Sequence, residues 1–185
     1  MRNVLLDTSF FIRFLNEDDP LFENADRYYQ CFLQNNIALK CSTISIAEFC
    51  VRGHIDELPL KNLQIVPFNF FHAQRAGELA RIVFENKGSL ELSIRAIISN
   101  DTKLFAQADL EMIDIYITSD TESIKIYNLL KDHTDLHFQI IDLHNKHIDP
   151  RTIIESICKK NSIDNSLPPN MFEIFKEDLL PRQTV

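Results

Sequence analysis

Residues 4–12 read VLLDTSFFI, and this stretch decides how the rest of the sequence is interpreted. An apolar run typical of a buried strand ends at Asp7, and the chain then enters an apolar pattern typical of a helix. In parallel α/β sheets, ligands bind in the crevice beyond the carboxyl ends of the strands. We therefore predict a strand, a carboxylate and a helix in succession, with Asp7 at the ligand-binding edge of a sheet.

The chain has 185 residues, which is enough for one domain with a substantial core and too few for two ordinary domains. Its hydrophobic content of 45% and charged content of 25% are typical of a globular protein. The net charge of −8 argues against a protein that coats nucleic acid by charge alone, but it allows an enzyme that holds nucleic acid through a metal ion. With only three glycines, the sequence contains neither a P-loop nor a GxGxxG motif.

The four cysteines, Cys31, Cys41, Cys50 and Cys158, have no CxxC spacing. We expect buried thiols in a reducing compartment rather than a disulfide framework or a zinc site. The sequence shows no charged-then-apolar leader and no apolar stretch of membrane-spanning length. These features predict a cytoplasmic protein that does not interact with a membrane.

Short apolar runs alternate with helical patterns, which predicts an α/β fold with a mostly parallel sheet. The expected strands cover residues 3–6, 37–41, 63–66, 113–117 and 138–141. The expected helices cover a region through residue 32 with a break at 16–20, the segment around 44–51, and residues 71–85, 93–110 and 123–130. Asp149 and Pro150 mark a further helix start, and we expect that helix to end near Lys160. We assign residues 1–148 to one domain and 149–185 to a C-terminal helical extension packed on it.

Asp101 lies on the apolar side of the most regular predicted helix. It follows Ile98 by three residues and precedes Leu104 by three, so its carboxylate projects from the stripe that faces the core. A buried, unpaired carboxylate costs several kcal/mol, so such groups are normally paired, hydrogen-bonded or bound to a metal. Asp101 is therefore a candidate ligand, with pairing to Lys103 or Arg95 as the structural alternative.

Asp120 is expected level with Asp101 on one edge of the sheet. From Asp101 the helix runs about 15 Å to its end, and the following strand returns by about 17 Å. The structural alternative is helix capping, because Ser119 and Glu122 match the S-x-x-E pattern of a capping box.

Glu48 and Asp7 complete a set of four acids, and both have structural alternatives. Ser45 and Glu48 match S-x-x-E, although Ser42 and Thr43 are equally good caps and would leave Glu48 in the second turn. Asp7 could cap the helix that follows it. The joint placement of the acids nevertheless favours a metal-dependent phosphodiesterase site.

Four segments in this order resemble the motifs of the PIN domain family. Residues 4–12 resemble its opening strand–Asp–Thr/Ser motif, and residues 43–49, TISIAEF, resemble the second motif with its helical Glu. Residues 101–108, DTKLFAQA, resemble the third acidic helix, and residues 117–120, ITSD, resemble the fourth motif. The resemblance spans about residues 1–142 and implies a three-layer α/β/α fold with a central, mostly parallel sheet.

The resemblance implies hydrolysis of RNA phosphodiester bonds with Mg²⁺ or Mn²⁺, which carboxylate oxygens bind well. The family's catalytic and metal-binding residues carry over to Asp7, Glu48, Asp101 and Asp120. The candidates for orienting these carboxylates are Thr8, Ser9, Thr118, Ser119 and Glu122. Arg13, Arg52 and Arg95 could contact substrate phosphate, with solvated surface residues as the alternative, and Arg13 and Arg95 are selected as the candidates.

The resemblance also bears on partners. It implies an RNA substrate and allows an antitoxin, another protein partner or a second copy of the chain, although residues 161–185 have no counterpart in the compact toxin members. A phosphatase of the haloacid-dehalogenase type is disfavoured, because its Asp-x-Asp motif would need Asp where Ser9 stands. The alternative left open is a weakly active or inactive PIN-fold protein that acts as a protein- or RNA-interaction module.

Overall fold

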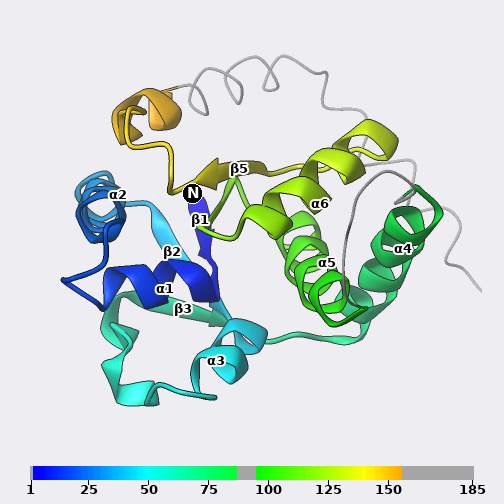
Figure 1. Ribbon diagram of the computed structural model, residues 1–185, viewed down its shortest axis with the longest axis horizontal. Coiled ribbons are helices and arrows are strands. Elements are labelled where there is room, and N and C mark those ends of the chain that lie inside the picture. Colours follow the sequence, from blue (N-terminus) through cyan, green and yellow to red (C-terminus); the bar gives the residue numbers. More distant parts are fainter. Residues whose placement is uncertain (1, 87–94, 156–185) are drawn as a thin grey trace, which may run out of the picture. The chain divides into compact units, whose positions relative to one another are not determined.

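The computed structural model describes residues 2–86 and 95–155, with the side chains of 95–99 left out of the description. Five parallel strands form one sheet in the order β3-β2-β1-β4-β5. The strands are β1 (Asn3–Leu6), β2 (Ala38–Ser42), β3 (Leu63–Val66), β4 (Ile115–Thr118) and β5 (Gln139–Asp142). The helices are α1 (Thr8–Phe14), α2 (Phe22–Gln34), α3 (Thr43–Phe49), α4 (Phe70–Asn86), α5 (Arg95–Leu110) and α6 (Thr121–His133). The predicted fold class, an α/β fold with a parallel central sheet between helices, is confirmed (Figure 1).

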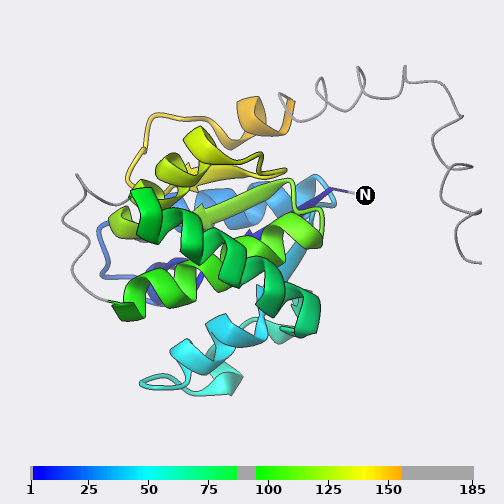
Figure 2. The same ribbon diagram turned by 90° about the vertical axis from the view of Figure 1, so that its right-hand side faces the viewer.

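The central strands are buried on both faces, as their continuous apolar sequences predict. Val4, Leu5 and Leu6 of β1 are completely inaccessible to solvent. Leu5 and its β4 neighbour Tyr116 belong to a core shared with α4, α5 and α6. The two-residue alternation of a strand turns Val4 and Leu6 to the opposite face, where α2 contacts β2. Figure 2 shows α4 and α5 on the near side of the sheet and α2 behind it.

The strand order reverses at β1, because β2 and β3 extend the sheet to one side and β4 and β5 to the other. In open α/β sheets, such a switch point opens a crevice at the carboxyl ends of the strands. The ends of β1 and β4, followed by Asp7 and by Ser119 and Asp120, meet at this crevice. The topology alone therefore brings the first and fourth predicted motifs together.

Most predicted elements lie within two residues of the observed ones. The helix predicted to include Val51 was drawn too long, because α3 ends at Phe49 with Cys50 as its C-cap, and two short 3₁₀ helices follow at Ile55–Glu57 and Leu60–Asn62. The prediction of buried thiols holds for Cys31 and Cys41 and is wrong for Cys50, which is exposed because it follows the last helical residue.

By compactness, the chain divides into residues 1–150 and residues 151–185. Residues 150–155 are helical, as the Asp149-Pro150 signal predicts. The predicted end of that helix near Lys160 and the packing of the extension lie outside the described residues, as does Cys158. Within the described ranges, none of the helices combines the length and apolarity needed to cross a membrane.

Candidate active site

The carboxyl edge of the sheet opens into a cavity of about 820 Å³. All four predicted acids, Asp7, Glu48, Asp101 and Asp120, line this cavity. They come from the end of β1, from α3, from α5 and from the residue before α6. The structure thus gathers side chains that are up to 113 positions apart in the sequence, counting from Asp7 to Asp120.

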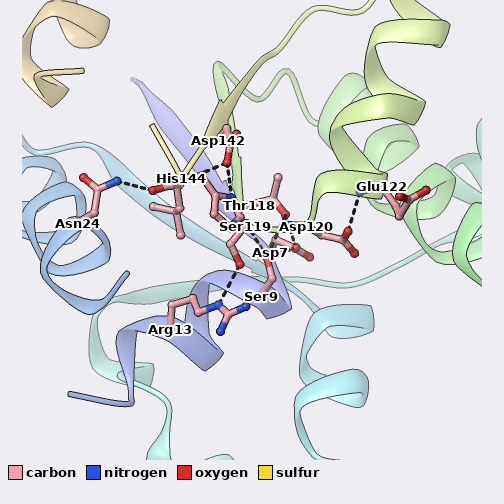
Figure 3. Close-up of polar contacts among 11 residues, drawn as sticks. Asp7, Ser9, Arg13, Asn24, Thr118, Ser119, Asp120, Glu122, Asp142 and His144 are labelled. Carbon is pink, nitrogen blue, oxygen red and sulfur yellow. Dashed lines mark hydrogen bonds and ion pairs between the residues drawn. The ribbon is translucent and has the colours of Figure 1, made fainter. Parts of the chain in front are cut away.

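Asp7 is held in place by hydroxyl groups. Its backbone occupies the N-cap position of α1, but its side chain makes no capping hydrogen bond, so the capping alternative is wrong. Instead, Oδ2 accepts hydrogen bonds from Ser9 Oγ at 2.7 Å and from Thr118 Oγ1 at 2.8 Å. The backbone N–H of Ser119 donates to Ser9 Oγ, and that of Asp120 donates to Thr118 Oγ1 (Figure 3). Two of the predicted orienting hydroxyls therefore contact this carboxylate directly.

Glu48 is fixed through both of its carboxylate oxygens. Thr8 Oγ1 donates to Oε2 at 2.6 Å, and the amide Nδ2 of Asn100 donates to Oε1 at 2.7 Å. Ser42, not Ser45, is the N-cap of α3, so Glu48 takes no part in a capping box. Because Thr8 and Asn100 lie on α1 and α5, this one carboxylate links α3 to both of those helices.

The surroundings of Asp101 disfavour the ionised form of its carboxyl group. Its residue is only 9% exposed, and its Oδ2 has no hydrogen-bond partner within the described part of the chain. Burial first, and then the negative charges of Asp7, Asp120 and Glu48, raise the pKa of this carboxyl to about 8. The Lys103 ammonium, an alternative partner in the sequence prediction, donates to Asn100 Oδ1 instead. An uncompensated buried carboxyl beside three other acids is the pattern expected of a functional group.

Asp120 serves as the N-cap of α6. Its Oδ1 accepts a hydrogen bond from the backbone N–H of Glu122 at 2.8 Å, so the cap is Asp120 itself and not Ser119. The Glu122 carboxylate pairs with Lys125 at 2.6 Å and is absent from the cavity lining. Asp120 therefore both caps a helix and lines the cavity.

The two predicted phosphate contacts have different outcomes. Arg13 forms an ion pair with Asp19 at 2.7 Å, and its Nε donates to Ser119 Oγ at 3.3 Å, as Figure 3 shows for the second contact. The side chain of Arg95 lies outside the described residues. Arg52, which was considered in the sequence for phosphate contact but not selected, lines the cavity.

Comparisons with known proteins support the assignment of the fold. No family model and no curated protein sequence matches the chain. A chain in the crystal structure of VapBC2 from Rickettsia felis, bound to a DNA fragment from their promoter, matches with a TM-score of 0.51 and 21% identity, over 76% of this chain and 99% of that chain. A chain in the crystal structure of DNA-bound VapBC from Salmonella typhimurium matches with a TM-score of 0.51 and 12% identity, over 77% and 99%. The chain has a PIN-like fold.

The PIN-like fold raises the question of whether the acids could hold a divalent cation. The residues that the structure describes include no three His, Cys, Asp or Glu side chains placed to hold one metal ion together. Mg²⁺, however, is usually bound by one or two carboxylates together with water and substrate phosphate. The unpartnered Oδ2 of Asp101 and the mutual proximity of the four acids fit an ion bound in that way.

Two polar residues at the carboxyl edge of the sheet were missed in the sequence. Asn100 precedes a selected acid, but its contact with Glu48 spans 52 positions and leaves no local pattern. Asp142 ends β5 beside Thr118, and an acid at the end of a strand is a signal that could have been followed. Its carboxylate accepts hydrogen bonds from the backbone and the ring of His144, both at 2.8 Å, and it does not line the cavity.

Proposed function

We propose that this chain is a Mg²⁺- or Mn²⁺-dependent endoribonuclease of the toxin type, acting in the cytoplasm on single-stranded RNA. The observation that carries the proposal is the buried carboxyl of Asp101, whose Oδ2 has no hydrogen-bond partner among the described residues and which lies with three other acids around one cavity at the switch point of a PIN-like sheet. Hard divalent cations prefer such oxygen ligands, and phosphodiester hydrolysis is a reaction in which they are effective.

The four acids take different roles in this proposal. Asp7, Asp101 and Asp120 would hold an ion directly or through water, and Glu48 would hold a second ion or orient a water molecule. A bound ion supplies activation of water and neutralisation of the charge that develops on phosphate. Burial and the neighbouring acids favour the protonated form of Asp101, and this proton must leave for the carboxylate to bind a cation.

The surrounding side chains keep these acids in position. Ser9 and Thr118 hold Asp7 by one oxygen, and Thr8 and Asn100 hold Glu48 by both. Groups of this kind fix the orientation of metal-binding carboxylates, and their loss typically costs about 10- to 100-fold in metal affinity or activity. Arg52 lines the cavity and would contact RNA phosphate, whereas Arg13 is already paired with Asp19.

We further propose an antitoxin-like protein partner. Both similar structures are described as VapBC assemblies bound to DNA, and one of them as bound to a fragment of their own promoter. On this chain, three apolar side chains that line the cavity are exposed to solvent: Ile12 at 52%, Leu15 at 37% and Val51 at 77%. Exposed apolar groups beside a charged site suit a protein that covers the site until it is released.

The central test compares the wild type with Asp7→Asn on single-stranded RNA in the presence of Mn²⁺. The variant should lose at least about 100-fold in cleavage rate, since a catalytic metal supplies several kcal/mol and each 1.4 kcal/mol is tenfold. It should keep its melting temperature within a few degrees, because the Asp7 side chain caps no helix. EDTA should abolish wild-type cleavage.

The matched control is Asp18→Asn, which makes the same change of charge at an exposed position that is not part of the cavity lining. It should cleave RNA like the wild type. If wild type and Asp7→Asn give equal results that EDTA does not alter, the chain is an interaction module and not a nuclease.

A further inference from the structure

Three buried polar atoms without a hydrogen-bond partner among the described residues belong to Asp101 and to two side chains near the acids. They are Oδ2 of Asp101, the hydroxyl of Tyr116 and Oγ of Ser123, and none has a hydrogen-bond partner of good geometry among the described residues. Leaving a buried polar group unsatisfied costs about 1–3 kcal/mol, so native structures rarely do so without a reason. Because three such atoms occur near the acids, we looked for one reason that accounts for all of them.

The position of Tyr116 follows from the strand register. Tyr116 lies opposite Leu5 in the parallel β1–β4 pair, and two residues later Thr118 donates its hydroxyl hydrogen to Asp7 Oδ2. Because side chains two apart share one face of a strand, Tyr116 and Thr118 project to the same side. The Tyr116 ring is completely buried and packs edge-on against Phe105, with centroids 5.2 Å apart and planes at 80°. This packing fixes the direction of the ring.

The phenol of Tyr116 lies near two of the acids, Asp7 and Asp101. The pKa of Tyr116 is raised well above its usual range by burial first, and then by the negative charges of Asp7 and Asp101. Ser123, which is fully buried in the first turn of α6, lies beside both Asp101 and Tyr116 and lowers the pKa of each. The phenol therefore stays protonated, and two neutral hydroxyl donors lie next to two carboxyl groups.

We propose that Tyr116 and Ser123 are positioning residues that support the acids from the core side, Tyr116 by donating a hydrogen bond to Asp7 and Ser123 by donating one to Asp101. Because neither hydroxyl has a hydrogen-bond partner of good geometry among the described residues, the hydrogen of each is available to the neighbouring carboxyl group. Each donor favours the ionised carboxylate and restrains its orientation toward the cavity. The effect on metal binding rests on the proposed function, whereas the hydroxyl contacts do not.

The variant Tyr116→Phe tests the proposal with little risk of unfolding, because it keeps the packed ring and removes only an unsatisfied hydroxyl. We expect its Mn²⁺ dissociation constant, measured by calorimetry, to rise by about tenfold. Ser123→Ala should act in the same direction. In RNA cleavage, Tyr116→Phe should lower kcat more than it changes KM, since the substrate does not touch the phenol.

The chain offers a matched control in Tyr28→Phe. Tyr28 is also completely buried and also has a hydroxyl without a partner in the described part of the chain. It belongs to α2, and burial raises its pKa to about 12, with Arg27 and Asp149 as its charged neighbours rather than the four acids. Tyr28→Phe should leave the Mn²⁺ dissociation constant unchanged.

A second measurement tests the contact without metal or RNA. The chain has four tyrosines, so ¹³Cζ-tyrosine labelling gives four signals that Tyr→Phe variants assign. Asp7→Asn should shift the Tyr116 signal and leave the Tyr28 signal in place. A Tyr116 signal that does not respond to Asp7→Asn, or a Tyr116→Phe dissociation constant equal to that of the wild type, would overturn the proposal. If the wild type cleaves no RNA but the Tyr116 signal responds, the nuclease proposal fails and the contact stands.

Discussion

At the scale of single residues, Asp101 makes the stability of the protein depend on pH. Its folded-state pKa is about 8 because the side chain is buried among acids, whereas an aspartate in an unfolded chain titrates near about 3.9. Between these values the folded protein holds a proton that the unfolded chain lacks. The stability that protonated Asp101 contributes to the folded state is therefore complete below about pH 4, and it is lost as the pH rises toward about 8.

We predict that the metal-free protein becomes less stable by a few kcal/mol between about pH 5 and about pH 8. Urea unfolding in EDTA at a series of pH values measures this slope. Asp101→Asn should flatten it, because the amide does not titrate, while Asp18→Asn should keep it. Equal slopes for the wild type and Asp101→Asn would show that another group is responsible.

Asn100 gives a second prediction at this scale. Lys103 can only donate, so it fixes Oδ1 of Asn100 as the acceptor and turns Nδ2 toward Glu48. Asn100→Ala should lower the RNA cleavage rate about 10- to 100-fold by releasing Glu48. The control Asn86→Ala removes an amide that, within the described part of the chain, bonds to its own helix at Ile82 O, and it should cleave normally. Equal rates for the two variants would mean that Glu48 needs no such support.

At the scale of elements, the sequence predicted the strands better than the ends of the helices. The strands at 3–6 and 63–66 were placed correctly to the residue, because an apolar run bounded by polar residues or proline marks both ends. The region after α3 failed for a physical reason. Its two short 3₁₀ helices depend on local capping, such as the contacts between His54 and Glu57, and not on a long apolar period.

A buried ion pair joins two of these elements. Arg75 on α4 bonds to Asp109 on α5 at 3.0 Å, and Asp109 also accepts a hydrogen bond from the backbone N–H of His137 ahead of β5. We predict that Asp109→Ala lowers the free energy of unfolding by about 3 kcal/mol, since the partly buried Arg75 loses its buried partner and the backbone N–H of His137 loses its acceptor. The Mn²⁺ affinity should not change, because Asp109 does not line the cavity.

Glu78→Ala is the control for this prediction, because Glu78 pairs with the same Arg75 at 3.1 Å but is half exposed. Its loss should change the free energy of unfolding by less than about 1 kcal/mol, as for other surface pairs. Similar urea midpoints for the two variants would contradict the assignment of Asp109 as the buried anchor between α4 and α5.

At the scale of the whole molecule, the net charge of −8 makes a prediction about RNA binding. Proteins that bind nucleic acid through many cations lose affinity steeply as salt rises. Here we expect Asp7→Asn to bind RNA only weakly in EDTA, with almost no loss of affinity between low and moderate salt. Fluorescence anisotropy measures both values. A steep loss of affinity with salt would reveal a cationic RNA surface that the overall charge conceals.

The whole site was partly predictable from the sequence. The convergence of Asp101 and Asp120 followed from element lengths, which are local properties of the chain, and that of Asp7 and Glu48 from the expected parallel order of the strands. The supporting groups were not predictable in the same way. Tyr116 stands in an apolar strand and reads as core, and Asn100 reads as helix surface, so only the packing of α5 against the sheet reveals their neighbours.

The central place of β1 has a consequence for the protein during its own synthesis. The strand β1 pairs with both β2 and β4. Its neighbour β4 is translated more than 100 residues after it. A nascent chain that has not yet released residue 120 from the ribosome lacks two of the four acids or holds them unassembled. On the proposed function, catalytic competence would then arise only after residue 120 has left the ribosome, so the growing chain would not cleave RNA before that point.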